Sequence, residues 1–323
     1  MSLPLPVHSR SAEERKPLSE AGQVWAWGTI AGLIAICVLV YLDSLRLTYG
    51  SWGNPQYSHG FLIPIFAAVL LWMKREPFRE VTMVERWCGV ALVIFAMIVR
   101  VVSAHYTTFT TDNLSLIPCL LGVFLLVGGW RSLKWAALPI AFLVFMYPWP
   151  DRLESLILVQ LKERVAMPVS LFSLQTLGVE AYLSGNIIEL GEGTRINVVA
   201  ACAGLGMLNI FLALAAAFAM IVTWRPIWER IVLFVSAVPI ALAANSMRIT
   251  GEGLIYYYGE RLMAADTVNW AAAFFHDHLA SWFMMVVALG LLYLEYQILR
   301  RVVLEDDEQQ TLSQHLPSKA AAK

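Results

Sequence analysis

Charged side chains are scarce in this sequence of 323 residues. Asp, Glu, Lys and Arg make up 15% of it, whereas hydrophobic residues make up 59%. A soluble domain carries about a quarter charged residues, so the shortage indicates that a lipid bilayer is the solvent for much of the chain. The formal net charge of −1 offers no basic surface of the kind that binds nucleic acid, and we expect no nucleic-acid partner.

Cysteine is also rare, and the four thiols are scattered. They show no CxxC spacing and no histidine clustering suited to zinc, so we expect no metal and no cofactor. HExxH and an intramembrane GxSxG are missing as well, which argues against a metal or serine protease. Cys37, Cys88 and Cys119 lie in or beside apolar runs, where a small buried hydrophobe is the ordinary role of a thiol.

Cys202 has a different setting, in "AACAGLG", where a polar loop gives way to an apolar run. Small residues around a thiol allow close helix packing. They also leave room around a nucleophile. The local sequence alone leaves both interpretations open.

Long apolar runs, in contrast, are plentiful. A membrane span needs about 20 mostly apolar residues, and the fold class predicted is an all-α polytopic membrane protein with about eight transmembrane helices. A membrane domain over 24–298 would lie between a polar N-terminus, 1–23, and a polar tail, 299–323. The predicted spans are 24–42, 59–74, 87–104, 114–130, 134–149, 197–223, 228–246 and 271–298.

The loops that would be cytoplasmic with both termini inside hold most of the 23 Lys and Arg residues. This bias predicts an N-in, C-in orientation. Segment 150–196 mixes charged and apolar residues. We predict that it forms an amphipathic helix on the outer interface, followed by a short β-hairpin.

Three spans bring reactive groups to the same predicted outer face. Cys202 begins the sixth, Asn245 and Arg248 end the seventh, and His276 and His278 open the eighth. A cysteine attacks carbonyl carbons as a thiolate, which a neighbouring histidine or cation favours. An arginine donates paired hydrogen bonds to an oxyanion or a carboxylate.

A non-enzymatic interpretation is the alternative. An arginine at the end of a span often reaches to the lipid headgroups, and an intramembrane Arg and His can line a transport pathway. The chain would then be a transporter or a subunit of polysaccharide export. We find no inverted repeat and no paired broken helices of the transporter kind.

Four short motifs resemble, in their residues and their order, those of the exosortase/archaeosortase family. They are an early "YSHGFL" followed by "VVAACAGLGML", "NSMR" and "FFHDHLASW". The resemblance covers roughly residues 25–298. It implies that Cys202 is the nucleophile, that Arg248 stabilises the oxyanion and that a histidine carries the proton. His276 is favoured for that role, and His278 is the competing histidine. Residues two apart on a helix point in nearly opposite directions, so only one of the two would face Cys202.

The same resemblance implies substrate-positioning roles for Asn245, His59 and Tyr57. His59 lies at the outer start of the second span, beside Tyr57, so both would share the outer face. The implied protein is a cysteine transpeptidase of the bacterial inner membrane with its active site on the periplasmic side. Its partners would be exported proteins with a C-terminal sorting tail of the PEP-CTERM kind, an unknown cell-surface acceptor and the lipid bilayer.

Overall fold

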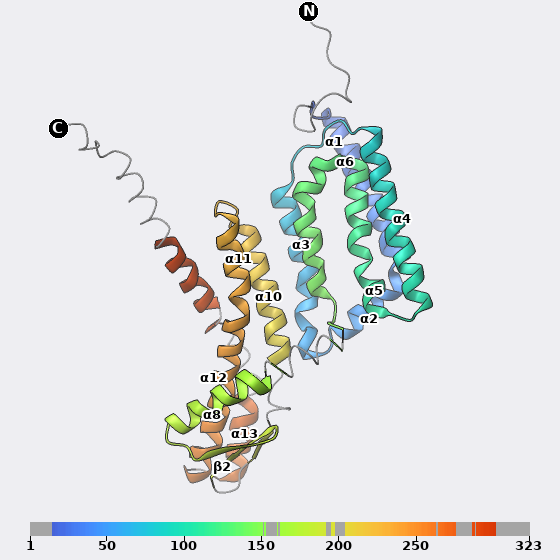
Figure 1. Ribbon diagram of the computed structural model, residues 1–323. Helices are drawn as coiled ribbons and strands as arrows, with labels where there is room; N and C mark the ends of the chain where they lie inside the picture. Colours follow the sequence, from blue (N-terminus) through green and yellow to red (C-terminus); the bar gives the residue numbers. More distant parts are fainter. Residues whose placement is uncertain are drawn as a thin grey trace, which may run out of the picture. The chain divides into compact units, whose positions relative to one another are not determined.

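The computed structural model describes residues 15–150, 152, 160, 162–191, 195–197, 204–262, 264–275, 286–287 and 289–301. The chain divides into two compact units, Met1–Leu156 and Ile157–Lys323. Each unit is described by itself, and Figure 1 gives the labels of the elements.

The first unit is helical throughout its described elements. Its α-helices are α1 (Glu20–Val40), α2 (Leu42–Ser51), α3 (Leu62–Lys74), α4 (Met83–His105), α5 (Phe109–Leu114) and α6 (Leu116–Ala141). Two 3₁₀ segments, η2 (Pro55–Phe61) and η3 (Phe142–Met146), adjoin α3 and α6.

α6 folds back on itself at Gly129, which can be followed in Figure 1. Gly129 has φ +65° and ψ −168°, a conformation that is essentially confined to glycine. The Ser132 hydroxyl donates to the carbonyl of Phe124 at 2.6 Å, eight residues back. In a straight helix these residues would be about 12 Å apart. The two arms match the separate predicted spans 114–130 and 134–149.

A buried polar cluster fixes the start of α4 against this turn. The Thr82 N–H donates to the Glu85 carboxylate at 2.8 Å, and the Glu85 N–H donates to the Thr82 hydroxyl at 3.3 Å. This reciprocal capping box satisfies two backbone donors that the helix itself leaves open. Glu85 also accepts from the Trp130 N–H at 3.3 Å and pairs with Arg15, so one carboxylate joins the N-terminal segment, α4 and α6.

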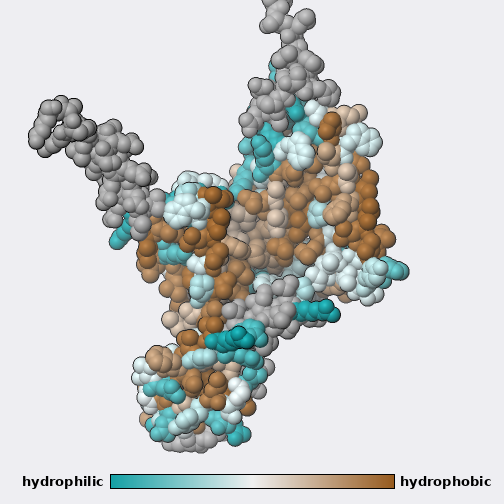
Figure 2. Space-filling model, viewed as in Figure 1, coloured by the Kyte–Doolittle hydropathy of each residue, from teal (hydrophilic) through white to brown (hydrophobic). Residues whose placement is uncertain are grey.

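The outer surface of these helices is apolar. Large side chains such as Ile36, Ile65, Val69 and Phe95 are exposed, and Figure 2 shows the helical surface of the first unit as mainly hydrophobic with polar ends. Such a surface is costly in water and suits lipid.

Among the described residues, five helical stretches are long and apolar enough to cross a membrane. The predicted count of eight spans is not tested by these five, because two of the predicted spans, 197–223 and 271–298, fall partly outside the described residues. The five stretches are Glu20–Val40, Tyr57–Lys74, Met83–His105, Phe109–Met146 and Ile227–Gly259, and Leu208–Ile221 is a shorter apolar helix.

The second unit combines helices with a small sheet. It contains a π-helix, η5 (Lys162–Ala166), then α8 (Met167–Thr176), strands β1 (Ala181–Ser184), β2 (Ile187–Leu190) and β3 (Arg195–Asn197), and helices α10 (Gly204–Ile221), α11 (Ile227–Val235), α12 (Ala237–Leu262) and α13 (Ala265–Phe274). Residues 289–301 are also helical.

The sheet is antiparallel with strand order β1-β2-β3. Ser184 pairs with Ile187 across a two-residue turn, and Gly185 supplies the positive φ of +60° that the first position of a tight hairpin turn requires. The predicted hairpin is therefore present. A third strand, β3, extends the hairpin and was not predicted from the sequence.

The core of this part lies between α8, the sheet and the second half of α12. Leu174 of α8, Ile188 of β2 and both Ile249 and Tyr257 of α12 belong to one buried cluster. α8 buries Met167, Ser170 and Leu174 on one face and exposes Val169 and Phe172, so apolar side chains also lie on its exposed face.

Candidate active site

α12 positions two of the predicted site residues, Asn245 and Arg248. The seventh predicted span ends at residue 246, but the helix continues to Leu262. The cause is packing, since the C-terminal half of α12 buries its apolar face against α8 and the sheet. Arg248 is thus in the middle of a helix rather than at its end.

The position of Arg248 along its helix can be calculated from helix geometry. α11 leads into α12 through Ser236 with backbone hydrogen bonds kept on both sides, from Ser236 N–H to the Val232 carbonyl at 2.9 Å and from Ile240 N–H to the Ser236 carbonyl at 3.0 Å. Counted from Ile227, Arg248 lies about 30 Å along this helix. That distance equals the thickness of the hydrocarbon core, so an Arg248 close to one membrane boundary fits the length.

Three polar side chains share one buried face of α12. Asn245, Arg248 and Glu252 are spaced i, i+3 and i+7, which places them one above another. Their exposed fractions are 6%, 2% and 8%. Burying a guanidinium and a carboxylate together reduces the electrostatic cost that either would have alone.

Glu252 was missed by sequence reasoning. The signal was there, since "NSMRITGE" repeats polar residues at helical spacing. It was overlooked because the span was expected to end before this turn.

The face next to these residues is tied to α8. The Ser170 hydroxyl lies 2.7 Å from the Ala166 carbonyl and 3.2 Å from the Ser246 carbonyl. The Thr250 hydroxyl donates to the same Ser246 carbonyl at 2.8 Å. These contacts fix the rotation of α12 and hence the direction of the face that carries Arg248.

α10 and α13 pack against α12 within this unit. α10 begins at Gly204, and its Asn209 is buried. At the end of α13, the Phe275 ring lies so close to Gly251 that a Cβ there would be 2.9 Å from it. Gly251 is three residues from Arg248, so Phe275 reaches the neighbouring turn of the same helix.

Cys202, His276 and His278 lie outside the described residues. Their roles stay predictions. One described stretch begins at Gly204, two residues after the cysteine, and another ends at Phe275, immediately before the first of these histidines.

Tyr57 and His59 lie in η2 of the first unit and are buried. The ring of Trp52 covers the next residue, Gly60, where a Cβ would lie 2.2 Å from the indole nitrogen. That nitrogen donates to the Met146 carbonyl at 2.9 Å. The glycine of "YSHG" is thus needed for packing between η2 and η3. The expectation that Tyr57 and His59 share a face with Arg248 stays a prediction, since the two units are described separately.

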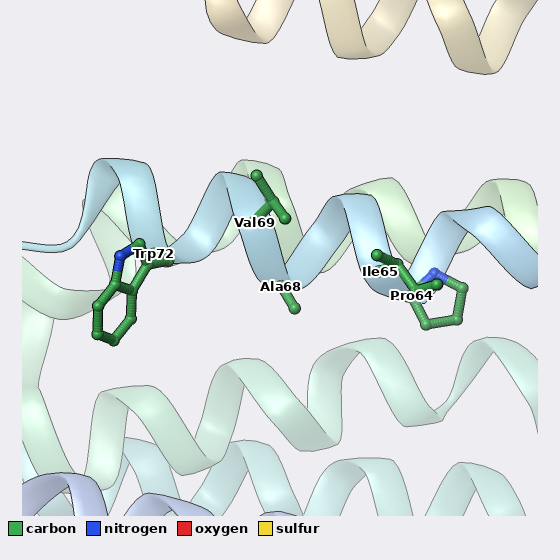
Figure 3. A pocket seen from close by; sticks show the side chains of 5 residues that line it. All are labelled: Pro64, Ile65, Ala68, Val69 and Trp72. Atoms are coloured by element: carbon green, nitrogen blue, oxygen red, sulfur yellow. The ribbon is translucent and has the colours of Figure 1, made fainter.

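A groove on α3 is apolar throughout its lining. Pro64, Ile65, Ala68, Val69 and Trp72 form it, and Figure 3 shows that they come from one helix. It offers a surface for lipid or another helix, and none of these five side chains supplies an acid, a base or a nucleophile. Among the described residues, no group of three or more His, Cys, Asp or Glu side chains is gathered as a metal site.

The family model described as Transmembrane exosortase (Exosortase_EpsH) matches residues 52–294. The chain belongs to the transmembrane exosortase family. The matched range contains every predicted site residue, from Tyr57 to His278, and it leaves α1 outside. No curated protein and no solved structure matches the chain. As a member of this family with several apolar helices, it is a multi-pass membrane protein.

Proposed function

We propose that this exosortase family member is a membrane-embedded cysteine transpeptidase. It cleaves the C-terminal sorting tail of exported proteins at the outer face of the bacterial inner membrane and transfers the new C-terminus to a cell-surface acceptor. Family membership carries the proposal. The buried Arg248 on α12 supports it, because a guanidinium from which water is largely excluded can stabilise a developing oxyanion.

In the proposed reaction the Cys202 thiolate attacks the scissile carbonyl carbon. Arg248 donates hydrogen bonds to the oxyanion that forms. The C–N bond then breaks, and the protonated His276 gives its proton to the leaving amine. His278 is the competing candidate for this step. The acceptor's nucleophile attacks the thioester, loses its proton to the histidine and releases the thiolate.

Asn245 and Glu252 complete the polar face around Arg248 in this proposal. Asn245 would hold the substrate peptide through its amide. Glu252 would balance the charge of the guanidinium from one turn away, since residues four apart are neighbours on a helix. Tyr57 and His59 are assigned to positioning the substrate.

Replacement of the nucleophile tests the proposal. Cys202→Ala should leave tail-bearing substrate protein at full length in the membrane, because no thioacyl intermediate can form. Immunoblotting of a tagged substrate in cells measures this. Cys88→Ala is the matched control, since Cys88 is a half-buried thiol of α4, and it should process normally. Normal processing by Cys202→Ala would disprove the proposal.

Thiol reactivity separates an enzyme from a transporter. An activated Cys202 should react with iodoacetamide faster than a free cysteine, and His276→Ala should abolish the difference. A transporter would show an ordinary thiol at position 202 in both proteins. Peptide mass spectrometry of the alkylated full-length protein gives the rates.

A further inference from the structure

Two thiols of the first unit meet in its interior. The Sγ atoms of Cys37 in α1 and Cys119 in α6 are 3.4 Å apart, and both residues are buried. They are separated by 82 positions in the sequence. Their proximity is therefore a product of the packing of α1 on α6.

The register of the two helices fixes this contact. One helical turn beyond Cys37, the Tyr41 hydroxyl lies 2.8 Å from the Ser115 hydroxyl, and Ser115 is one turn before Cys119. Residues 37 and 41 thus face residues 119 and 115, as expected for antiparallel neighbours. Two contacts on successive turns hold the sulfur atoms opposite each other, so their proximity does not depend on one side-chain rotamer.

The pair lies near one end of both helices. Cys37 is three residues from Val40, the end of α1, and Cys119 is three residues from Leu116, the start of α6. With the N-terminus inside, these ends face the outer side, where thiols are oxidised. We propose that Cys37 and Cys119 form a disulfide that ties α1 to the rest of the first unit.

The geometry is close to what the bond requires. A disulfide places its sulfur atoms about 2.05 Å apart, so they must approach by about 1.4 Å, from the 3.4 Å observed. A covalent bond here would close a chain loop of about 80 residues, a long loop of the kind whose cross-linking restricts an unfolded chain most.

The reaction is a thiol–disulfide exchange with an external oxidant. One thiol loses its proton and attacks a disulfide of a periplasmic oxidoreductase, forming a mixed disulfide. The second thiolate attacks the cysteine sulfur of that intermediate. One S–S bond forms between Cys37 and Cys119, and the oxidant's disulfide receives two electrons and two protons and becomes a dithiol.

This disulfide would have a role separate from catalysis. α1 precedes the range matched by the family, residues 52–294, and Cys37 lies in it. The bond would tie α1, which lies before the matched range, covalently to α6, which lies inside it. The inference rests on the proposed orientation but not on the chemistry assigned to Cys202, which must keep a free thiol.

Counting free thiols tests the inference on the full-length protein. Membranes are acidified to stop thiol exchange, and no N-ethylmaleimide is added. The protein is then denatured and treated with a polyethylene-glycol maleimide, which adds to each free thiol a mass that is resolved on a gel. Without reductant, two of the four cysteines should be tagged, namely Cys88 and Cys202. After reduction all four should be tagged. Four tags in both samples would overturn the proposal.

Cys37→Ser is the second variant. Without reductant it should show three tags, because Cys119 loses its partner, and reduction should not change that number. Protection of Cys119 in this variant would assign it another partner and overturn the pairing. In thermal unfolding, reductant should lower the midpoint of the wild-type protein and leave that of Cys37→Ser unchanged.

The outcome is independent of substrate processing. The Cys202→Ala assay reports on the transpeptidase proposal, and the number of tagged thiols reports on the Cys37–Cys119 disulfide. Maleimide labelling of the outer loops, described below, reports on the orientation. Each of the three can fail alone, and the failures are distinguishable.

Discussion

Arg248 illustrates how a single side chain acquires a role from its surroundings. It is 2% exposed on a helix whose neighbouring faces pack against α8 and against Phe275. A guanidinium keeps its charge under all ordinary conditions and donates in a planar fork. At this position it can stabilise a developing negative charge in a setting from which water is largely excluded.

Arg248→Lys should therefore lower tail processing by about 10²–10³-fold, the loss typical of one missing oxyanion donor. Lysine keeps the charge but not the fork of paired donors. Time courses of substrate cleavage in membranes measure the rate. The matched control is Arg261→Lys on the same helix, which contacts Tyr257 through its guanidinium. Equal rates for Arg248→Lys and the wild type would contradict the role assigned to the fork.

Gly129 carries the fold-back of α6 through its backbone. Gly129→Ala should lower stability by about 1–3 kcal/mol, because its φ and ψ are strained for any residue with a Cβ. The new Cβ would also lie 2.9 Å from the Glu85 carboxylate. Thermal unfolding of the protein in detergent checks this.

Gly32→Ala is the control for this change. Gly32 lies inside α1, and a Cβ there meets no atom within 4 Å. Alanine in a helix interior is favoured by about 0.5–1 kcal/mol over glycine. Gly32→Ala should thus be neutral or stabilising. An equal loss of stability in both variants would show that the backbone conformation of Gly129 is not the cause of the effect.

Among the elements, the layer of α8, the sheet and the C-terminal half of α12 supports the candidate site. Ile188 is fully buried in it, and Ile249, the residue next to Arg248, belongs to the same cluster. The layer therefore determines how α12 is rotated. A cavity in this layer should therefore disturb the position of Arg248, although no polar group of the candidate site is replaced.

Ile188→Ala should destabilise the second unit by about 2–5 kcal/mol, the usual effect of a cavity in a core. Processing should fall with it. Tyr182→Ala on the adjacent strand is the control, because Tyr182 is 66% exposed and its loss leaves no cavity. Protease resistance of the segment 162–197 in membranes, together with substrate cleavage, measures both effects. Unchanged protease resistance in Ile188→Ala would contradict the role of this layer in supporting the candidate site.

For the whole molecule, the testable feature is which loops face outward. In a background without native cysteines, Ser184→Cys at the β1–β2 turn should react with a membrane-impermeant maleimide on intact cells. Thr223→Cys, between α10 and α11, should react only after permeabilisation. Both positions are exposed, so a difference reports sidedness and not burial. The reverse pattern would invert the predicted orientation.

Several features of the molecule follow from sequence alone. Apolar runs of sufficient length determine that helices cross a bilayer, because unsatisfied backbone groups are too costly in lipid. Gly185 and the alternation around it predict the hairpin. The order of four short motifs led to the exosortase family, which the family model confirms. All of these are local patterns that can be read within one segment.

Tertiary structure decided what depends on contacts between distant segments. The extension of α12 beyond residue 246 arises from packing on α8 and the sheet, and it brought Glu252 into the candidate site. The meeting of Cys37 with Cys119 depends on the register of α1 against α6. Hydrophobic periodicity specifies which face of a helix is buried, but not which other helix covers it. Only the packed structure contains that information.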